Sequence, residues 1–260
     1  MSVLSAVKQL SITTGLYRPI RGLYRRVHPS RQRAFQEDVD LYRALLPPGA
    51  LRFDVGANTG EKSEALLLAG ASRVVAFEPN PAVQSELRAR CGRWENWTAV
   101  EAALGGAAGF ATLHTRESTA QSSLLEDWEG SITGACHVPV LTLDSAVEHF
   151  GRPFYLKIDV EGWELEVLKG LTRPVPLTSF EFHLNEQDIR KTLACLERLG
   201  QFGPARVNLT PAEGSRFHLA EWEPLERFLG WFPDDLERTL PGYHYGDIFV
   251  ESLTPPGQRD

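Results

Sequence analysis

The sequence has few cysteines and no long apolar run. Its three cysteines, Cys91, Cys136 and Cys195, lie far apart and form no Cys-x-x-Cys pair, which argues against a disulfide framework and a structural zinc site. No apolar stretch approaches the ~18 residues that span a bilayer. The N-terminus also lacks the apolar segment and small-residue cleavage site of a secretory signal. We therefore expect a cytoplasmic protein without a transmembrane segment.

Acidic side chains are absent from the first 35 residues. This stretch contains seven basic residues, namely Lys8, Arg18, Arg21, Arg25, Arg26, Arg31 and Arg33. Because the whole chain has a formal net charge of −7, the remaining residues carry −14. The basic stretch suits a peripheral contact with an anionic membrane or substrate, or ion pairs with the acidic body. Nucleic acid is not an expected partner, because the acidic body would repel it.

Short apolar runs alternate with helical patterns from residue 50 onward. The predicted strands are 51–56, 73–78, 97–104, 153–162, 177–184 and 246–253, with helices at 61–70, 81–91 and 186–200. Residues 110–115 alternate in polarity and are expected to form an antiparallel excursion, and residues 137–150 a strand that runs into a helix. This alternation predicts an α/β fold of the Rossmann-like type, with a doubly wound, mainly parallel sheet.

Pro47 and Pro48 divide the chain. Residues 1–48 are predicted to form a basic N-terminal helical segment, because the two prolines end a helix there. Residues 49–252 form the predicted α/β domain. The Pro-rich residues 253–260 are expected to be a disordered tail.

Ligands of a doubly wound sheet bind beyond the carboxyl ends of its strands. Gly56 and Gly60 follow the first strand, where they permit a turn and a close backbone approach. Glu78 ends the second strand, and a carboxylate there can accept hydrogen bonds from both hydroxyls of a ribose. An adenosine-containing cofactor is therefore expected at these strand ends.

The residues around these glycines distinguish three cofactors. With Gly56 fixed, the NAD fingerprint requires glycine at positions 58 and 61, which are Asn58 and Glu61. A phosphate-binding loop requires glycine before Lys62, and Glu61 stands there instead. S-adenosylmethionine has no phosphate, and its cationic sulfonium and ammonium groups favour nearby carboxylates such as Asp54 and Glu78. The sequence therefore favours S-adenosylmethionine.

Several segments together resemble the FkbM-type methyltransferases. They are FDVGANTG (53–60), VVAFEPNP (74–81), VLTLDS (140–145) and LKIDVEGWELEVLKG (156–170), with FEFH (180–183) and DIF (247–249) also similar. The resemblance covers roughly residues 50–200 and resumes near 246. It implies a class I methyltransferase fold with S-adenosylmethionine as donor. It also implies O-methylation of a hydroxyl on a sugar, polyketide or other small secondary metabolite.

The resemblance also implies a set of cofactor-binding residues. They are Asp54, Gly56, Asn58, Thr59, Gly60, Glu78, Pro79, Asn80, Glu101, Ala102, Ser122, Ser123 and Asp159. The 54–60 loop would line the methionine part, Glu78 would hold the ribose, and Glu101 and Ala102 would lie near the adenine. Trp163 departs from the family pattern, in which a smaller residue is commoner.

Acidic and basic side chains at the fourth and fifth strand ends are candidates for catalysis. Methyl transfer to a hydroxyl requires orientation of the reactants and a base. Strand alternation places Glu181 and His183 on one face, and Asp159 lies at the end of the adjacent strand. We predict His183 or Asp159 as the base, with Glu161 in the turn nearby. A magnesium ion held by Asp159, Glu161 and His183 is an alternative that the spacing does not favour.

An aromatic-rich stretch, residues 204–245, has no counterpart in the family. Its aromatic residues include Trp222, Phe228, Trp231, Phe232, Tyr243 and Tyr245. Aromatic surfaces suit sugar rings, so this stretch is predicted to cover the acceptor site; additional core packing is the alternative.

Two rival functions stay open at this point, an NAD-type oxidoreductase and a catalytically silent module with a methyltransferase fold.

Overall fold

The computed structural model describes residues 10–14, 16–17, 20–21, 28–128, 130–212, 214–239 and 245–254. Within these residues, no helix is both long and apolar enough to cross a membrane. The predicted tail beyond residue 254, most of the basic N-terminal stretch and Tyr243 lie outside the described residues. The division at residues 48 and 252 stays a prediction.

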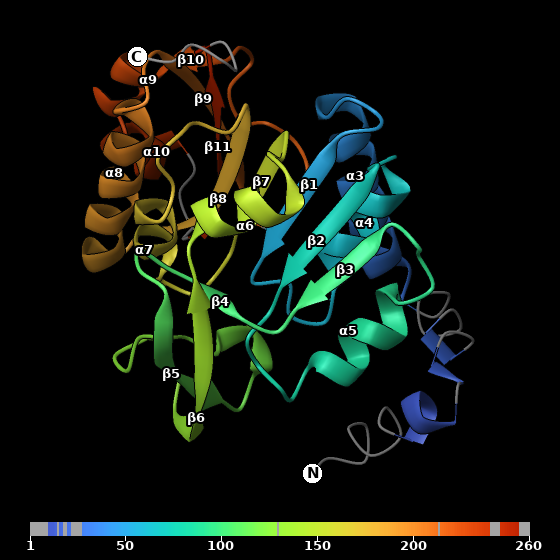
Figure 1. The fold of residues 1–260 in the computed structure, drawn as a ribbon. Helices are drawn as coiled ribbons and strands as arrows, with labels where there is room; N and C mark the ends of the chain where they lie inside the picture. Colours follow the sequence, from blue (N-terminus) through green and yellow to red (C-terminus); the bar gives the residue numbers. More distant parts are fainter. Residues whose placement is uncertain are drawn as a thin grey trace.

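An eight-stranded sheet forms the centre of the protein (Figure 1). Its order is β10-β9-β11-β8-β7-β1-β2-β3. The pairs β3–β2, β2–β1, β1–β7 and β7–β8 are parallel, whereas β11 is antiparallel to both its neighbours, β8 and β9. The mainly parallel sheet is therefore confirmed. The strands are β1 (Leu51–Val55), β2 (Arg73–Phe77), β3 (Trp97–Val100), β7 (Tyr155–Ile158), β8 (Leu177–His183), β9 (Ala205–Pro211), β10 (Glu223–Pro224) and β11 (Tyr245–Ser252).

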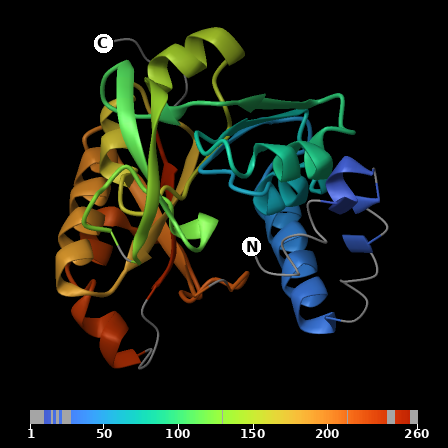
Figure 2. The same ribbon diagram turned by 90° about the horizontal axis from the view of Figure 1, so that it is seen from below.

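Helices cover both faces of the sheet, as Figure 2 shows with α3 in blue and α8 in orange on opposite sides. The strands β2 and β7 alternate between two cores: Val74 and Tyr155 pack toward α3 and α4, whereas Val75 and Leu156 pack toward α6, α7, α8 and α9. This alternation is the period of two expected of a strand buried on both faces. The helices are α3 (Pro29–Leu45), α4 (Glu61–Leu68), α5 (Gln84–Cys91), α6 (Leu143–Phe150), α7 (Glu164–Lys169), α8 (Glu186–Gly200), α9 (Leu225–Leu229) and α10 (Asp234–Thr239).

A second, three-stranded sheet extends from one end of the main one (Figure 1). It contains β4 (Ala103–Leu104), β5 (Gly109–Arg116) and β6 (Ile132–Leu141), with β5 antiparallel to β6. The predicted antiparallel excursion is thereby confirmed. The single strand predicted at 97–104 is wrong, because the chain leaves the main sheet after Val100 and β4 pairs with β6 instead.

The aromatic-rich stretch contributes to the main sheet and to its core. Residues 205–211 form β9, inside the sheet. Phe228 and Phe232 are buried, and their rings stack at a centroid distance of 5.0 Å. Phe232 also packs edge-on against Phe182 of β8. These two rings therefore serve core packing, and the predicted cover over the acceptor stays a prediction for the rest of the stretch.

Near the N-terminus, ion pairs join the chain to the acidic body. Arg21 lies 2.7 Å from Glu64 of α4, and Lys62 of α4 pairs with Asp38 of α3 at 2.8 Å. Tyr17 donates a hydrogen bond to Glu86 of α5 at 2.8 Å. The expected pairing of arginines with the body is thus seen at Arg21.

Asn185 caps α8, whose apolar face fills one core. Its side-chain oxygen accepts a hydrogen bond from the Asp188 backbone N–H at 2.9 Å. We expect Asn185→Ala to lower the free energy of unfolding by about 1 kcal/mol, because that N–H loses its acceptor. Urea denaturation of this variant and of Gln187→Ala, an exposed change in the same turn, measures the difference. Equal losses in both variants would contradict the capping role.

Candidate functional site

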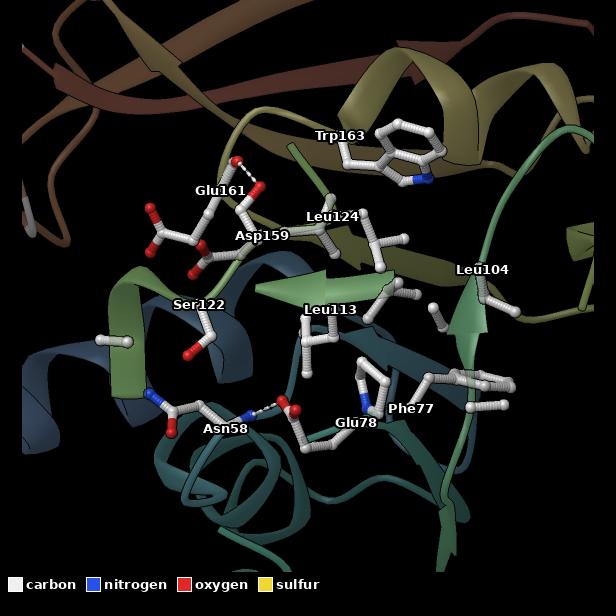
Figure 3. Close-up of a pocket in the computed structure, with 18 of the residues that line it drawn as sticks. Asn58, Phe77, Glu78, Leu104, Leu113, Ser122, Leu124, Asp159, Glu161 and Trp163 are labelled. Carbon is white, nitrogen blue, oxygen red and sulfur yellow. Dashed lines mark hydrogen bonds between the residues drawn. The ribbon is translucent and has the colours of Figure 1, made fainter. Parts of the chain in front are cut away.

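A pocket opens at the carboxyl ends of β1, β2 and β7 (Figure 3). Residues 117–128, which follow β5 and include the short 3-10 helix η1 (Thr119–Gln121), form one wall and are called the cover segment. The space amounts to about 680 Å³ when the solvent at its mouth is included. Its polar lining consists of Asn58, Glu78, Thr119, Ser122, Ser123, Asp159 and Glu161.

The turn after β1 passes very close to the end of β7. Gly56 has a φ of +83°, and a Cβ atom on it would lie 1.7 Å from the carbonyl oxygen of Asp159. The Asp159 N–H in turn donates to the carbonyl of Val55 at 2.9 Å. Only glycine fits both this backbone angle and this approach. The contact sets the floor of the pocket and the position of Asp159.

Glu78 is held by two backbone N–H groups. Its two carboxyl oxygens accept hydrogen bonds from Asn58 and Asn80, each at 2.7 Å. Burial raises the pKa of Glu78 to about 7, although these hydrogen bonds oppose the shift. Each carboxyl oxygen has a further lone pair, so Glu78 can still accept hydrogen bonds from two neighbouring hydroxyls of a ligand.

The other end of the pocket is apolar. Leu104, Leu113 and Leu124 line it together with Trp163 (Figure 3). Such a lining suits a flat aromatic ring. The pocket therefore combines an apolar slot, a buried carboxylate and a glycine turn, which together match the adenine, ribose and amino-acid parts of an adenosyl amino acid.

Three carboxyl groups gather at the carboxyl ends of β7 and β8. Asp159, Glu161 and Glu181 each offer an oxygen within 4.8 Å of the others. Burial and the neighbouring acids raise the pKa of Glu161 to about 8, and burial and Asp159 raise that of Glu181 to about 7. Lys157 donates to Asp159 at 2.6 Å. Because acidic clusters also occur without an ion, we assign no metal to this group.

His183 contacts Glu181, which lies on the same strand. Its Nε2 is 3.3 Å from a Glu181 carboxyl oxygen, and it lines a smaller neighbouring pocket, not the main one. Burial lowers the pKa of His183, but the hydrogen bond and the charge of Glu181 outweigh burial and raise it to about 9. His183 therefore holds its proton at neutral pH. Among the described residues, Glu181 and not His183 completes the predicted Asp159–Glu161 cluster.

The structure brings most of the predicted cofactor residues to the pocket wall. Those that line it are Gly56, Asn58, Glu78, Pro79, Ala102, Ser122, Ser123 and Asp159, and the catalytic candidate Glu161 lines it too. Asp54, Thr59, Gly60, Asn80 and Glu101 are not in the lining. Asp54 is fully buried behind the turn, where Ser63 donates to it at 2.6 Å. The Glu101 side chain is exposed and pairs with Arg88 at 2.6 Å.

The apolar lining and Glu181 are the residues that the sequence analysis did not select. Leu104, Leu113 and Leu124 come from β4, β5 and the cover segment, which are brought together by the second sheet. No local pattern distinguishes them from core leucines. Glu181 shares a strand face with His183, and this alternation is the signal that could have selected it.

Comparison with known proteins identifies a family and several likenesses. The family model described as Methyltransferase FkbM domain matches residues 54–202. The hexuronic acid methyltransferase AglP of Haloferax volcanii is 29% identical over 175 residues, which are 63% of this chain and 71% of that protein.

Two solved structures overlap with the fold in part. Fibrillarin of Aeropyrum pernix, crystallised with natively bound S-adenosyl-L-methionine, has a TM-score of 0.44 and 12% identity over 84% of this chain and 75% of that chain. A precorrin-6y C5,15-methyltransferase of Geobacter metallireducens has a TM-score of 0.45 and 14% identity over 83% and 87%. The family assignment rests on the match over residues 54–202.

Gly56 provides a test of the close approach between β1 and β7. We expect Gly56→Ala to lower the free energy of unfolding by about 3 kcal/mol or more, because it combines an unfavourable φ with a backbone clash. Gly49 has a similar φ of +76° but open space around it, so Gly49→Ala should cost about 1 kcal/mol. Urea denaturation of both variants separates the cost of the backbone angle, which both share, from the cost of the steric clash at Gly56. Equal losses in the free energy of unfolding would contradict the clash.

Proposed function

This chain belongs to the FkbM methyltransferase family, and we propose that it methylates a hydroxyl oxygen of a sugar of the hexuronic acid class. The donor is S-adenosylmethionine. The observation that carries the proposal is one pocket in which Glu78 can hold two neighbouring hydroxyls and Asp159 and Glu161 stand as candidate proton acceptors. The relative AglP, named for methylation of a hexuronic acid, supports the sugar class.

The residues at the pocket fit this donor in three parts. The apolar slot of Leu104, Leu113 and Leu124 suits the adenine. Glu78 is placed to accept hydrogen bonds from the ribose hydroxyls, and the turn at Gly56 and Asn58 faces the amino-acid part. When bound, the donor supplies a methyl group on a positively charged sulfur. The nearby carboxyl groups favour that positive charge.

Glu161 and Asp159 are the candidates that this geometry supports for accepting the hydroxyl proton. Both line the donor pocket, whereas His183 lines the neighbouring pocket, and its contact with Glu181 raises its pKa to about 9, which disfavours it as a base. The pKa of Glu161, raised to about 8, is close to the operating pH of a general base. Trp128 donates to one carboxyl oxygen of Glu161 at 2.9 Å, which orients the group and leaves its second oxygen for the acceptor.

The two rival functions are not favoured. An NAD-type oxidoreductase would require phosphate-binding features at the first turn, where Asn58 and Glu61 stand. A silent module would have no need of Glu78, Asp159 and Glu161 in one lined pocket. The family match agrees with a methyltransferase.

Calorimetric titration tests the donor, and product analysis tests the acceptor. We expect S-adenosylmethionine and S-adenosylhomocysteine to bind at micromolar concentration, NAD not to bind, and EDTA to leave donor binding unchanged.

With a hexuronic acid glycoside as acceptor, we expect the product to be a methyl ether that resists mild base. A base-labile methyl ester would refute the hydroxyl assignment, and equal transfer to the matching neutral hexose would refute the uronic acid preference.

The pH dependence of turnover tests Glu161 as the base. The ionised carboxylate accepts the proton and exists above its pKa, so kcat should rise with pH and level off above about 8. Glu161→Gln should lower kcat about 100-fold and flatten this rise, because a positioned base contributes that much. Glu166→Gln, in an exposed ion pair with Lys169, is the control. A Glu161→Gln enzyme with the wild-type rate and pH profile would exclude Glu161 and leave Asp159.

A further inference from the structure

The guanidinium of Arg116 is buried among backbone carbonyl groups. Arg116 ends β5, and only 3% of the residue is exposed. Its three nitrogens lie 3.1 to 3.4 Å from six backbone oxygens. Because they carry five N–H groups, at least one N–H is shared between two of these acceptors. The acceptors are the carbonyl groups of His114, Gln121, Leu125, Glu126, Trp128 and Gly130. Four of these six residues belong to the cover segment.

This arrangement satisfies a stretch of irregular backbone. Apart from η1, the cover segment has no helix or strand to supply partners for its carbonyl groups, and buried carbonyls without partners are costly. A guanidinium has five N–H groups in a rigid planar fork, so one side chain can serve several carbonyls at once. The shape of the cover segment therefore depends on Arg116 more than on regular secondary structure.

The cover segment connects two parts of the site. On one side, Thr119, Ser122 and Leu124 line the donor pocket, and Ser122 accepts a hydrogen bond from Asn80 at 3.3 Å. On the other side, the segment reaches the turn between β7 and α7. Its conformation therefore affects both the donor wall and the carboxyl groups beyond β7.

Three contacts fasten the segment to that turn. Ser123 Oγ donates to the backbone oxygen of Glu161 at 2.7 Å, and Trp128 Nε1 donates to its carboxyl group at 2.9 Å. The Trp128 ring lies against Gly162, where a Cβ would come within 2.5 Å of ring atoms. Glu161 itself has a φ of +56°, an unusual angle for a residue with a side chain, and these contacts help to hold it.

We propose that Arg116 is a positioning residue for the donor: it holds the cover segment in its binding shape before any ligand arrives. The wall is then preorganised, and donor binding does not bear the entropy of ordering it. The proposal rests on the donor pocket of the proposed function and not on the identity of the acceptor.

Binding of S-adenosylhomocysteine by calorimetry tests this role. We expect Arg116→Met to raise Kd at least tenfold and Arg116→Lys, which keeps the charge but loses the fork, to raise it about threefold to fivefold. Arg190→Met, at an exposed ion pair with Glu186 on α8, should leave Kd unchanged. If Arg116→Met does not fold, the lysine variant decides. A folded Arg116 variant with wild-type affinity would overturn the proposal, whereas no binding by the wild type would refute the donor assignment instead.

Hydrogen–deuterium exchange without ligand distinguishes positioning from a general loss of stability. In Arg116→Met we expect faster exchange over residues 117–128, including the Ser123 amide that donates to His114, and unchanged exchange in β1 and β7. Faster exchange throughout the sheet would overturn the proposal.

A double-mutant cycle with Trp128→Phe provides a third test. If both residues act through the same segment, the effect of Trp128→Phe on Kd should be present in the wild type and vanish in Arg116→Met. Independent, additive effects on Kd would count against a shared segment and overturn the role of Arg116 in holding it.

Discussion

The close contact between the turn after β1 and the end of β7 is the constraint on which the site depends. At Gly56 the two backbones approach so closely that no side chain fits between them. The Asp159 N–H, bonded to Val55, continues the parallel ladder by one residue past the last paired strand position. Asp159 and Glu161 consequently emerge beside the glycine turn, at the pocket that Glu78 also lines. A wider gap would separate the glycine turn from the carboxyl groups proposed to accept the hydroxyl proton.

The pKa values of two carboxyl groups in this site are raised toward neutral pH. Burial raises the pKa of Glu78 to about 7 and that of Glu161 to about 8, because each loses water around its charged form. The buried Lys157 offsets part of the negative charge by its contact with Asp159. A cationic donor stabilises the ionised carboxyl groups further. The acidic residues of the pocket are thus compatible with the cationic S-adenosylmethionine, whereas they would repel a cofactor that carries phosphate groups.

The shape of the cover segment, and with it one wall of the pocket, depends on the guanidinium of Arg116 and not on pairing in a β-sheet. Arg116 satisfies backbone carbonyls that regular structure would otherwise pair. The segment then contacts Glu161 through both its backbone and its side chain. The donor wall and the candidate base are therefore parts of one hydrogen-bonded unit.

Much of the architecture could be predicted from local pattern, and the errors have physical reasons. Buried parallel strands are short apolar runs, and those that end in glycine or acid, such as β1, β2 and β7, were recognisable. The run at 97–104 looked equally apolar, but its second half pairs with β6, a partner 37 residues away that no local pattern reveals. The family resemblance implied a place near the adenine for Glu101, whereas in the structure its side chain is exposed and pairs with Arg88.

By itself, the sequence determined the fold class, the glycine turn and the acid at the end of β2, because strand periodicity and the conformational freedom of glycine are local properties. Only the tertiary structure decided which side chains meet. It placed Glu181, and not His183, beside Asp159, because His183 lies two residues further along β8 and pairs with Glu181. It also set the proton affinities, because burial and neighbouring charges depend on contacts between distant segments.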